Sequence, residues 1–103
     1  MTIADIKDFV LSADPNAQHY KSARKGEAYT VWRELRQLPI IADDTHEAAW
    51  AFQIDRFTKN ENDQVAAEIA RAIEENEEIS CELTVDFEQD TGYIHYIFDC
   101  EGI

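Results

Sequence analysis

The sequence is poor in the residues that interrupt regular structure. It holds three Gly and two Pro among 103 residues, so we expect regular helices and strands with few special turns. The Gly residues stand alone at positions 26, 92 and 102, which excludes a Gly-rich phosphate-binding loop. The Gly-x-Ser-x-Gly motif of many hydrolases is also missing. We therefore predict that the protein is not an enzyme and that it uses no cofactor.

Long apolar runs are missing as well. No run approaches the roughly 20 residues that span a bilayer, and the first residues lack the basic and apolar regions of a signal peptide. A protein made in the cytoplasm, without membrane association, is expected. The 45% hydrophobic and 11% aromatic content suffices for the core of one domain over residues 1–103.

Cysteine and histidine are too few to indicate a metal centre. Cys81 and Cys100 lack a Cys-x-x-Cys spacing and are expected to be reduced core residues, with a disulfide or thiol switch as the alternative. His46 follows two Asp residues, but no second ligand pair stands at a metal-binding spacing. His95 could meet both Cys residues on neighbouring strands, yet three ligands leave a zinc site incomplete. No metal site is predicted.

Basic residues are nearly missing from the second part of the chain. The net charge is −13. Residues 1–60 carry nine acids and eight bases, whereas residues 61–103 carry thirteen acids and one base, Arg71, for a net charge of −12. Such a field repels nucleic acid and anionic lipid and attracts basic surfaces. The localised charge indicates a directed use, such as a docking face, although solubility alone is the simpler interpretation.

Hydrophobic periodicity predicts six elements. Thr2 is expected to cap the first helix, with Asp5 three residues later, and Asn60 or Asn62 to cap the second. Strict alternation along the first strand places Arg33 and Arg36 on opposite faces. A polar loop is expected at about 14–26, and a hairpin turn at 89–92. The elements are helix 2–12, strands 27–38 and 47–58, helix 62–76, and strands 79–88 and 93–100.

This order predicts an α+β fold. Strands joined in pairs by short connections form an antiparallel four-stranded sheet, and the two amphipathic helices pack on one of its faces. The predicted order is α-β-β-α-β-β.

Two segments carry a resemblance to a known family. The first runs from Ala42-Asp43-Asp44 through Trp50–Asn60 and Asp63 and along the helix as far as Ile73. The second is Phe87–Tyr96, with an acidic turn and the tripeptide Asp-Thr-Gly. In order and spacing they resemble the tail completion proteins of long-tailed bacteriophages, also called tail terminators or head-to-tail joining proteins. The resemblance covers roughly residues 27–100, and residues 14–26 are longer and more polar than the family pattern.

The resemblance implies a structural role in virion assembly. Proteins of this family form a ring, commonly a hexamer, that caps the tail tube and offers a docking surface to the head connector. The implied partners are other copies of the chain, the tail-tube protein and the head-tail connector protein. DNA passes without specific binding. The implied location is the tail-head junction of the phage or prophage virion, after assembly in the host cytoplasm.

Two charged surfaces are candidates for this role. A weakly basic loop could pair with an acidic surface of the next subunit, and acidic residues could line a lumen that repels DNA phosphates or form a docking face. The basic candidates are Lys21, Arg24 and Lys25. The acidic candidates are Glu74, Glu75, Glu77, Glu78, Glu82 and Asp86.

The strong acidity leaves a second function open. An acidic inhibitor or DNA mimic would bind the basic groove of a nucleic-acid enzyme. A mimic should spread its carboxylates over one exposed face and act as a monomer or dimer. Among structural roles, a neck adaptor is hard to separate from a tail terminator by sequence.

Overall fold

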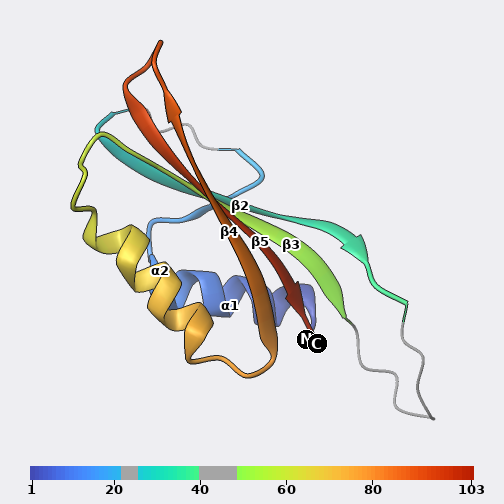
Figure 1. The fold of residues 1–103 in the computed structure, drawn as a ribbon. Coiled ribbons are helices and arrows are strands. Elements are labelled where there is room, and N and C mark those ends of the chain that lie inside the picture. The colour runs from blue at the N-terminus through green and yellow to red at the C-terminus, as the bar shows by residue number, and fades with distance from the viewer. Residues whose placement is uncertain (22–25, 40–48) are drawn as a thin grey trace.

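The computed structural model describes residues 1–21, 26–39 and 49–103. Figure 1 shows two helices on one face of a twisted sheet, with the last hairpin extending past the helices. The predicted α+β class is confirmed. In chain order the elements are α1 (Ile3–Ala13), β1 (Gln18–His19), β2 (Ala28–Gln37), β3 (Trp50–Thr58), α2 (Gln64–Glu74), β4 (Ile79–Glu88) and β5 (Tyr93–Gly102).

The sheet has one more strand than predicted. Its order is β1-β2-β3-β5-β4, with β1 parallel to β2 and the other neighbours antiparallel. The polar segment 14–26, predicted as a loop, therefore contains a strand. Tertiary contacts fix it, because the His19 ring stacks on Trp32 at 3.9 Å and the Tyr20 N–H donates to the Trp32 carbonyl at 2.8 Å. A strand of two polar residues has no periodicity that a sequence could reveal.

The two helix starts differ in how well they were predicted. Thr2 caps α1 in a capping box with Asp5, as expected. The prediction of Asn60 or Asn62 as the cap of α2 is wrong, because Asp63 is the N-cap and accepts from the Ala66 N–H at 3.0 Å. Asn60 is used in the preceding turn, where its side chain accepts from the Asn62 N–H.

The core lies between the helices and one face of the sheet. Alternation along β3 places Phe52 and Ile54 on that face with no exposed surface, as the sequence predicts. Both helices cover it with apolar stripes at helical spacing. The buried cluster comprises Ile6, Val10, Ala13, Trp32, Phe52, Ile54, Ile69, Ile73, Ile79, Phe98 and Cys100.

A β-bulge changes the faces of β2. The register with β3 shifts between Glu34 and Arg36, so that Arg36 lies opposite Ala51 while Glu34 lies opposite Phe52. Phe52 faces the core, and Ala51 therefore faces the helix-free side. The prediction that Arg33 and Arg36 lie on opposite faces is wrong, because one extra residue restores them to the same face.

The β4–β5 hairpin closes at the predicted turn. Gly92 has φ of +79°, a conformation that favours glycine, and its N–H donates to the Glu88 carbonyl at 2.8 Å. The register of β4 and β5 then runs from Glu88–Tyr93 to Ile79–Gly102 with no shift.

Candidate functional site

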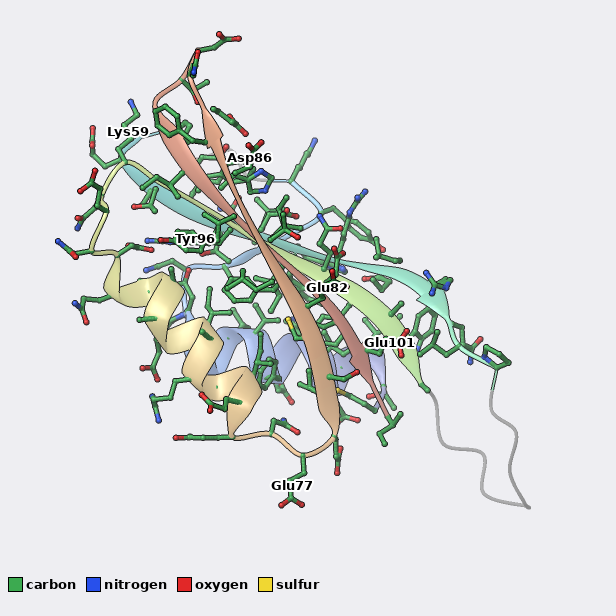
Figure 2. The ribbon with its side chains drawn as sticks, in the orientation of Figure 1. Lys59, Glu77, Glu82, Asp86, Tyr96 and Glu101 are labelled. Carbon is green, nitrogen blue, oxygen red and sulfur yellow. The ribbon has the colours of Figure 1, made fainter. Side chains whose placement is uncertain are left out.

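The six acidic candidates lie on two different surfaces. Four of them, at positions 74, 75, 77 and 78, lie at the end of α2 and in the turn that follows. Glu82 and Asp86 lie along β4 on its helix-free face, because they alternate with the apolar residues of that strand. All six are exposed. Figure 2 shows Glu77 at the α2–β4 turn and Glu82 and Asp86 farther along β4.

Basic neighbours neutralise little of this acid. Arg71 bonds Glu75 at 3.0 Å and also pairs with Glu68. All three side chains are well exposed, so these pairs are screened by solvent and contribute little to stability. The Arg71 guanidinium is thus engaged on its own helix. The acidic residues around the α2–β4 turn therefore keep most of their negative electrostatic potential.

The predicted basic loop is described only at its start. Lys21 follows β1 and is exposed. Arg24 and Lys25 lie outside the described residues. The proposed pairing of these three residues with an acidic neighbour stays a prediction.

The helix-free face carries a shallow groove with acidic walls. The groove has a volume of about 500 Å³ and runs across β2, β3, β5 and β4. Glu82 and Asp99 lie directly opposite each other on β4 and β5, and both line it beside Glu101. Like charges in opposite positions destabilise a sheet. Arg36 from β2 also lines the groove and places a positive charge in it.

An aromatic group occupies the other end of that face. The Phe57 ring stacks on Tyr29 at 4.7 Å and on His95 at 4.1 Å, and Tyr93 meets both Tyr29 and Phe57 edge-on. His95 Nε2 is 2.8 Å from an Asp55 carboxylate oxygen. These contacts give the face a stable surface without a helix layer.

Sequence reasoning missed the polar network around Arg56, whose side chain is buried. Its guanidinium bonds the Asp63 carboxylate through Nε at 2.8 Å and Nη2 at 3.0 Å, and Nη1 donates to the Thr30 hydroxyl at 3.1 Å. Asp14, at the end of α1, lies 3.7 Å away. The network joins the end of one helix to the start of the other. The alternation of β3, which puts Arg56 on the core side with Phe52, was the available signal.

The Asp63 carboxyl is held in its charged form by this network. Burial alone would raise its pKa, but hydrogen bonds from Arg56 and from the Ala66 N–H outweigh burial and lower the pKa from 3.8. The contact is an ion pair with a structural role.

The two cysteines lie opposite each other on β4 and β5. Both are free thiols, Cys100 buried and Cys81 half-buried. The hydrogen bond with Cys81, together with burial, raises the pKa of the Cys100 thiol. His95 lies on the opposite face of the sheet, since it alternates with Cys100 along β5, so the three residues do not meet. Within the described ranges, no group of three His, Cys, Asp or Glu side chains is placed to hold a metal ion.

The most unusual surface is the outer half of β4, residues 83–88, which we call the β4 arm. Its apolar side chains lie on the same face as the helices, yet α2 covers only the start of the strand. Leu83, Val85 and Phe87 are 46%, 54% and 57% exposed. Between α2 and β4, a groove of about 330 Å³ ends at Leu83. Neighbouring exposed apolar side chains of this kind mark interaction surfaces.

Comparison with known proteins assigns no family, because no protein-family model and no curated protein sequence matches the chain.

Among the described residues, no helix is both long and apolar enough to cross a bilayer.

Proposed function

We propose that the protein is a structural tail completion protein of a phage or prophage. In this role it forms a ring, commonly hexameric in the resembling family, that caps the tail tube and joins it to the head connector. It would be assembled in the host cytoplasm and reside at the tail-head junction of the virion. Its partners would be other copies of itself, the tail-tube protein and the head-tail connector protein.

The observation that carries the proposal is the uncovered β4 arm. In a monomer, three large apolar side chains on one face of an edge strand would stay exposed to water, which is unfavourable. A subunit buried in a ring would cover them. The resemblance of Trp50–Asn60 and Phe87–Tyr96 to tail completion proteins suggests that this ring is a tail completion ring.

Because the acidic candidates lie on two surfaces, they cannot all line one lumen. Carboxylates in a lumen would repel DNA phosphates and let DNA slide. The acids around the α2–β4 turn and the acids of β4 lie on opposite sides of the sheet, so one lumen surface would take one group. The other group would then face a neighbouring subunit, the tube or the connector.

Size and shape of the purified protein test the proposal. Light scattering after size-exclusion chromatography should show a closed oligomer whose population grows with concentration. Negative-stain microscopy should show rings with a central hole. A compact monomer at every concentration, with no binding to tail-tube or connector proteins encoded beside it, would overturn the proposal.

The same preparation addresses the DNA-mimic alternative. A mimic should spread its carboxylates over one exposed face, whereas the acids of this chain lie on both the helix layer and the helix-free face. Retention of a purified nuclease or repair enzyme by the monomer, competed by DNA, would favour the mimic over the ring.

A further inference from the structure

The β4 arm is part of an open sheet edge. β4 is the last strand of the sheet order, and no described strand pairs with its outer side. It runs for ten residues in unbroken register with β5. Folded proteins usually protect such edges with Pro, charged side chains or a bulge. The sequence of β4, ISCELTVDFE, contains no Pro, and its charged side chains are all acidic, so this edge repels another acidic strand but can accept a basic one.

The opposite edge of the sheet is half open. β1 pairs with β2 at Val31 and Trp32, and beyond Trp32 the described residues place no strand on that side. The part of β2 with no described strand beside it is therefore residues 33–37, in which the Glu34 side chain is bonded by His19 and Tyr20. Its two bases, Arg33 and Arg36, are exposed, and the bulge puts both on the helix-free face.

The two edges match in direction. β2, β3, β5 and β4 are antiparallel in turn, so β4 runs opposite to β2. When β4 of one copy lies beside β2 of a second copy in the same orientation, the strands pair antiparallel and the sheet continues. The helix layers of both copies then lie on one side. β1 limits the register because it blocks β2 up to Trp32.

The two edges also match in charge. On the helix-free face, β4 presents Glu82, Asp86 and Glu88, and residues 33–37 of β2 present Arg33 and Arg36, which the bulge places two register positions apart. Because β1 blocks β2 up to Trp32, the antiparallel register sets Glu88 opposite Arg33 and Asp86 opposite Arg36. Opposite charges across neighbouring strands stabilise a sheet, and like charges destabilise it. A two-fold pairing of β4 with β4 that continues the sheet would instead bring two acidic rows together. The head-to-tail contact is therefore favoured over the symmetric dimer.

We infer that β4 of one copy pairs antiparallel with residues 33–37 of β2 in the next copy. The inference rests on the proposed ring function and assigns the contact that builds it. Leu83, Val85 and Phe87 then lie on the side that carries the helix layer of the next copy. A head-to-tail contact uses two different surfaces and closes into a ring when the rotation permits. In this arrangement Asp86 and Glu88 serve the subunit interface, which leaves the acids of the α2–β4 turn for a lumen or docking face.

Complementary charge reversal tests the contact. One variant carries Asp86→Lys with Glu88→Lys, and the other carries Arg33→Glu with Arg36→Glu. Each alone should raise the concentration at half-assembly by about tenfold or more, because two attractive pairs become repulsive. An equimolar mixture should assemble again, since each altered edge meets its complement. Light scattering at low salt measures all three samples.

Matched controls separate this contact from net charge. Asp8→Lys with Glu61→Lys, at two exposed acids outside both candidate surfaces, makes the same charge change as the first variant, and Lys7→Glu with Lys59→Glu matches the second. Both should assemble like the unaltered chain. Circular dichroism confirms that every variant is folded, and a chain carrying all four interface substitutions should assemble by itself.

The outcomes distinguish the contact from the function. Rings in the unaltered protein together with normal assembly of both interface variants would overturn the β4–β2 contact and leave the ring proposal standing. Monomers of the unaltered protein at every concentration would overturn both. Loss of assembly in the β4 variant alone would point to a different partner edge and would also overturn the β2 assignment.

Discussion

The region around Arg56 and the β4 arm belong to one sheet but differ in how their side chains are satisfied. Arg56 is 6% exposed, and its guanidinium is bonded to Asp63 and Thr30 with Asp14 close by. The β4 arm has the reverse character, with apolar side chains in solvent and charged ones in a row on the other face. One region is complete within the chain, and the other has the composition of a surface that a partner covers.

The difference indicates where the chain fixes its fold and where it meets other proteins. A buried ion pair with all its hydrogen bonds holds two helix ends in place and tolerates little change. An exposed edge strand adds little to the stability of the monomer, because its side chains bury little surface. Substitutions in the first region should therefore unfold the protein, while substitutions in the second should alter association.

The largest expected contrast is between two phenylalanines. Phe52→Ala should lower the free energy of unfolding by about 3–5 kcal/mol, because it leaves a cavity in the core. Phe87→Ala should change it by less than about 1 kcal/mol in the monomer, since Phe87 is 57% exposed. Urea unfolding at a concentration that keeps the protein monomeric measures both. Equal losses would show that the β4 arm is buried in the monomer.

The second-largest loss in the free energy of unfolding should come from removing the buried guanidinium of Arg56. Arg56→Met should cost about 3 kcal/mol or more, because Asp63 and Asp14 are left buried without their counter-charge. Arg33→Met on the neighbouring strand is the control, and it should leave the unfolding midpoint of the monomer nearly unchanged because Arg33 is exposed. A small loss for Arg56→Met would show that the network is dispensable.

The pH dependence of stability should report the same network. The pKa of Asp63 is lowered from 3.8 in the folded protein, so its ionised form stabilises the fold above that pH. This stability is lost as the pH falls below 3.8 toward the lowered value. The difference in unfolding midpoint between the unaltered protein and Asp63→Asn should be largest near neutral pH and shrink below about pH 4. A pH-independent difference would contradict the role of the charge.

The smallest change in monomer stability should come from neutralising a single acidic residue on the helix-free face of β4. Glu82→Gln removes the like-charge pair with Asp99, and the monomer should gain roughly 0.5 kcal/mol at low salt. The gain should fade as salt screens the charges. Asp86→Asn is the control, because Asp86 lies opposite His95 and no like-charge pair is relieved. A gain of the same size in both variants would assign the effect to net charge.

Most of the fold could be predicted because its elements follow one periodicity each. The strand at 79–88 has the predicted bounds, since its apolar and polar residues alternate throughout. Where the sequence failed, a distant contact decided the local structure. Asp63 is a cap fixed partly by Arg56, and the two-residue β1 is held by Trp32.

The candidate site was predictable only in part. The sequence located the acid in residues 61–103, and alternation along the strand at 79–88 placed Glu82 and Asp86 on its polar face, but no local pattern showed that this strand lies at the sheet edge. It also could not show that Arg33 and Arg36 share a face, because a bulge is set by pairing between strands.

The sequence by itself determined the α+β class, the hairpin turn at Gly92 and the uneven charge, because these depend on local periodicity and composition. Only the tertiary structure decided that β4 lies at the sheet edge, that Arg56 is buried, and that acidic side chains of β4 and basic side chains of β2 lie at opposite edges of the described sheet. Strand order and burial depend on which distant segments pair and pack, and no local pattern records that choice.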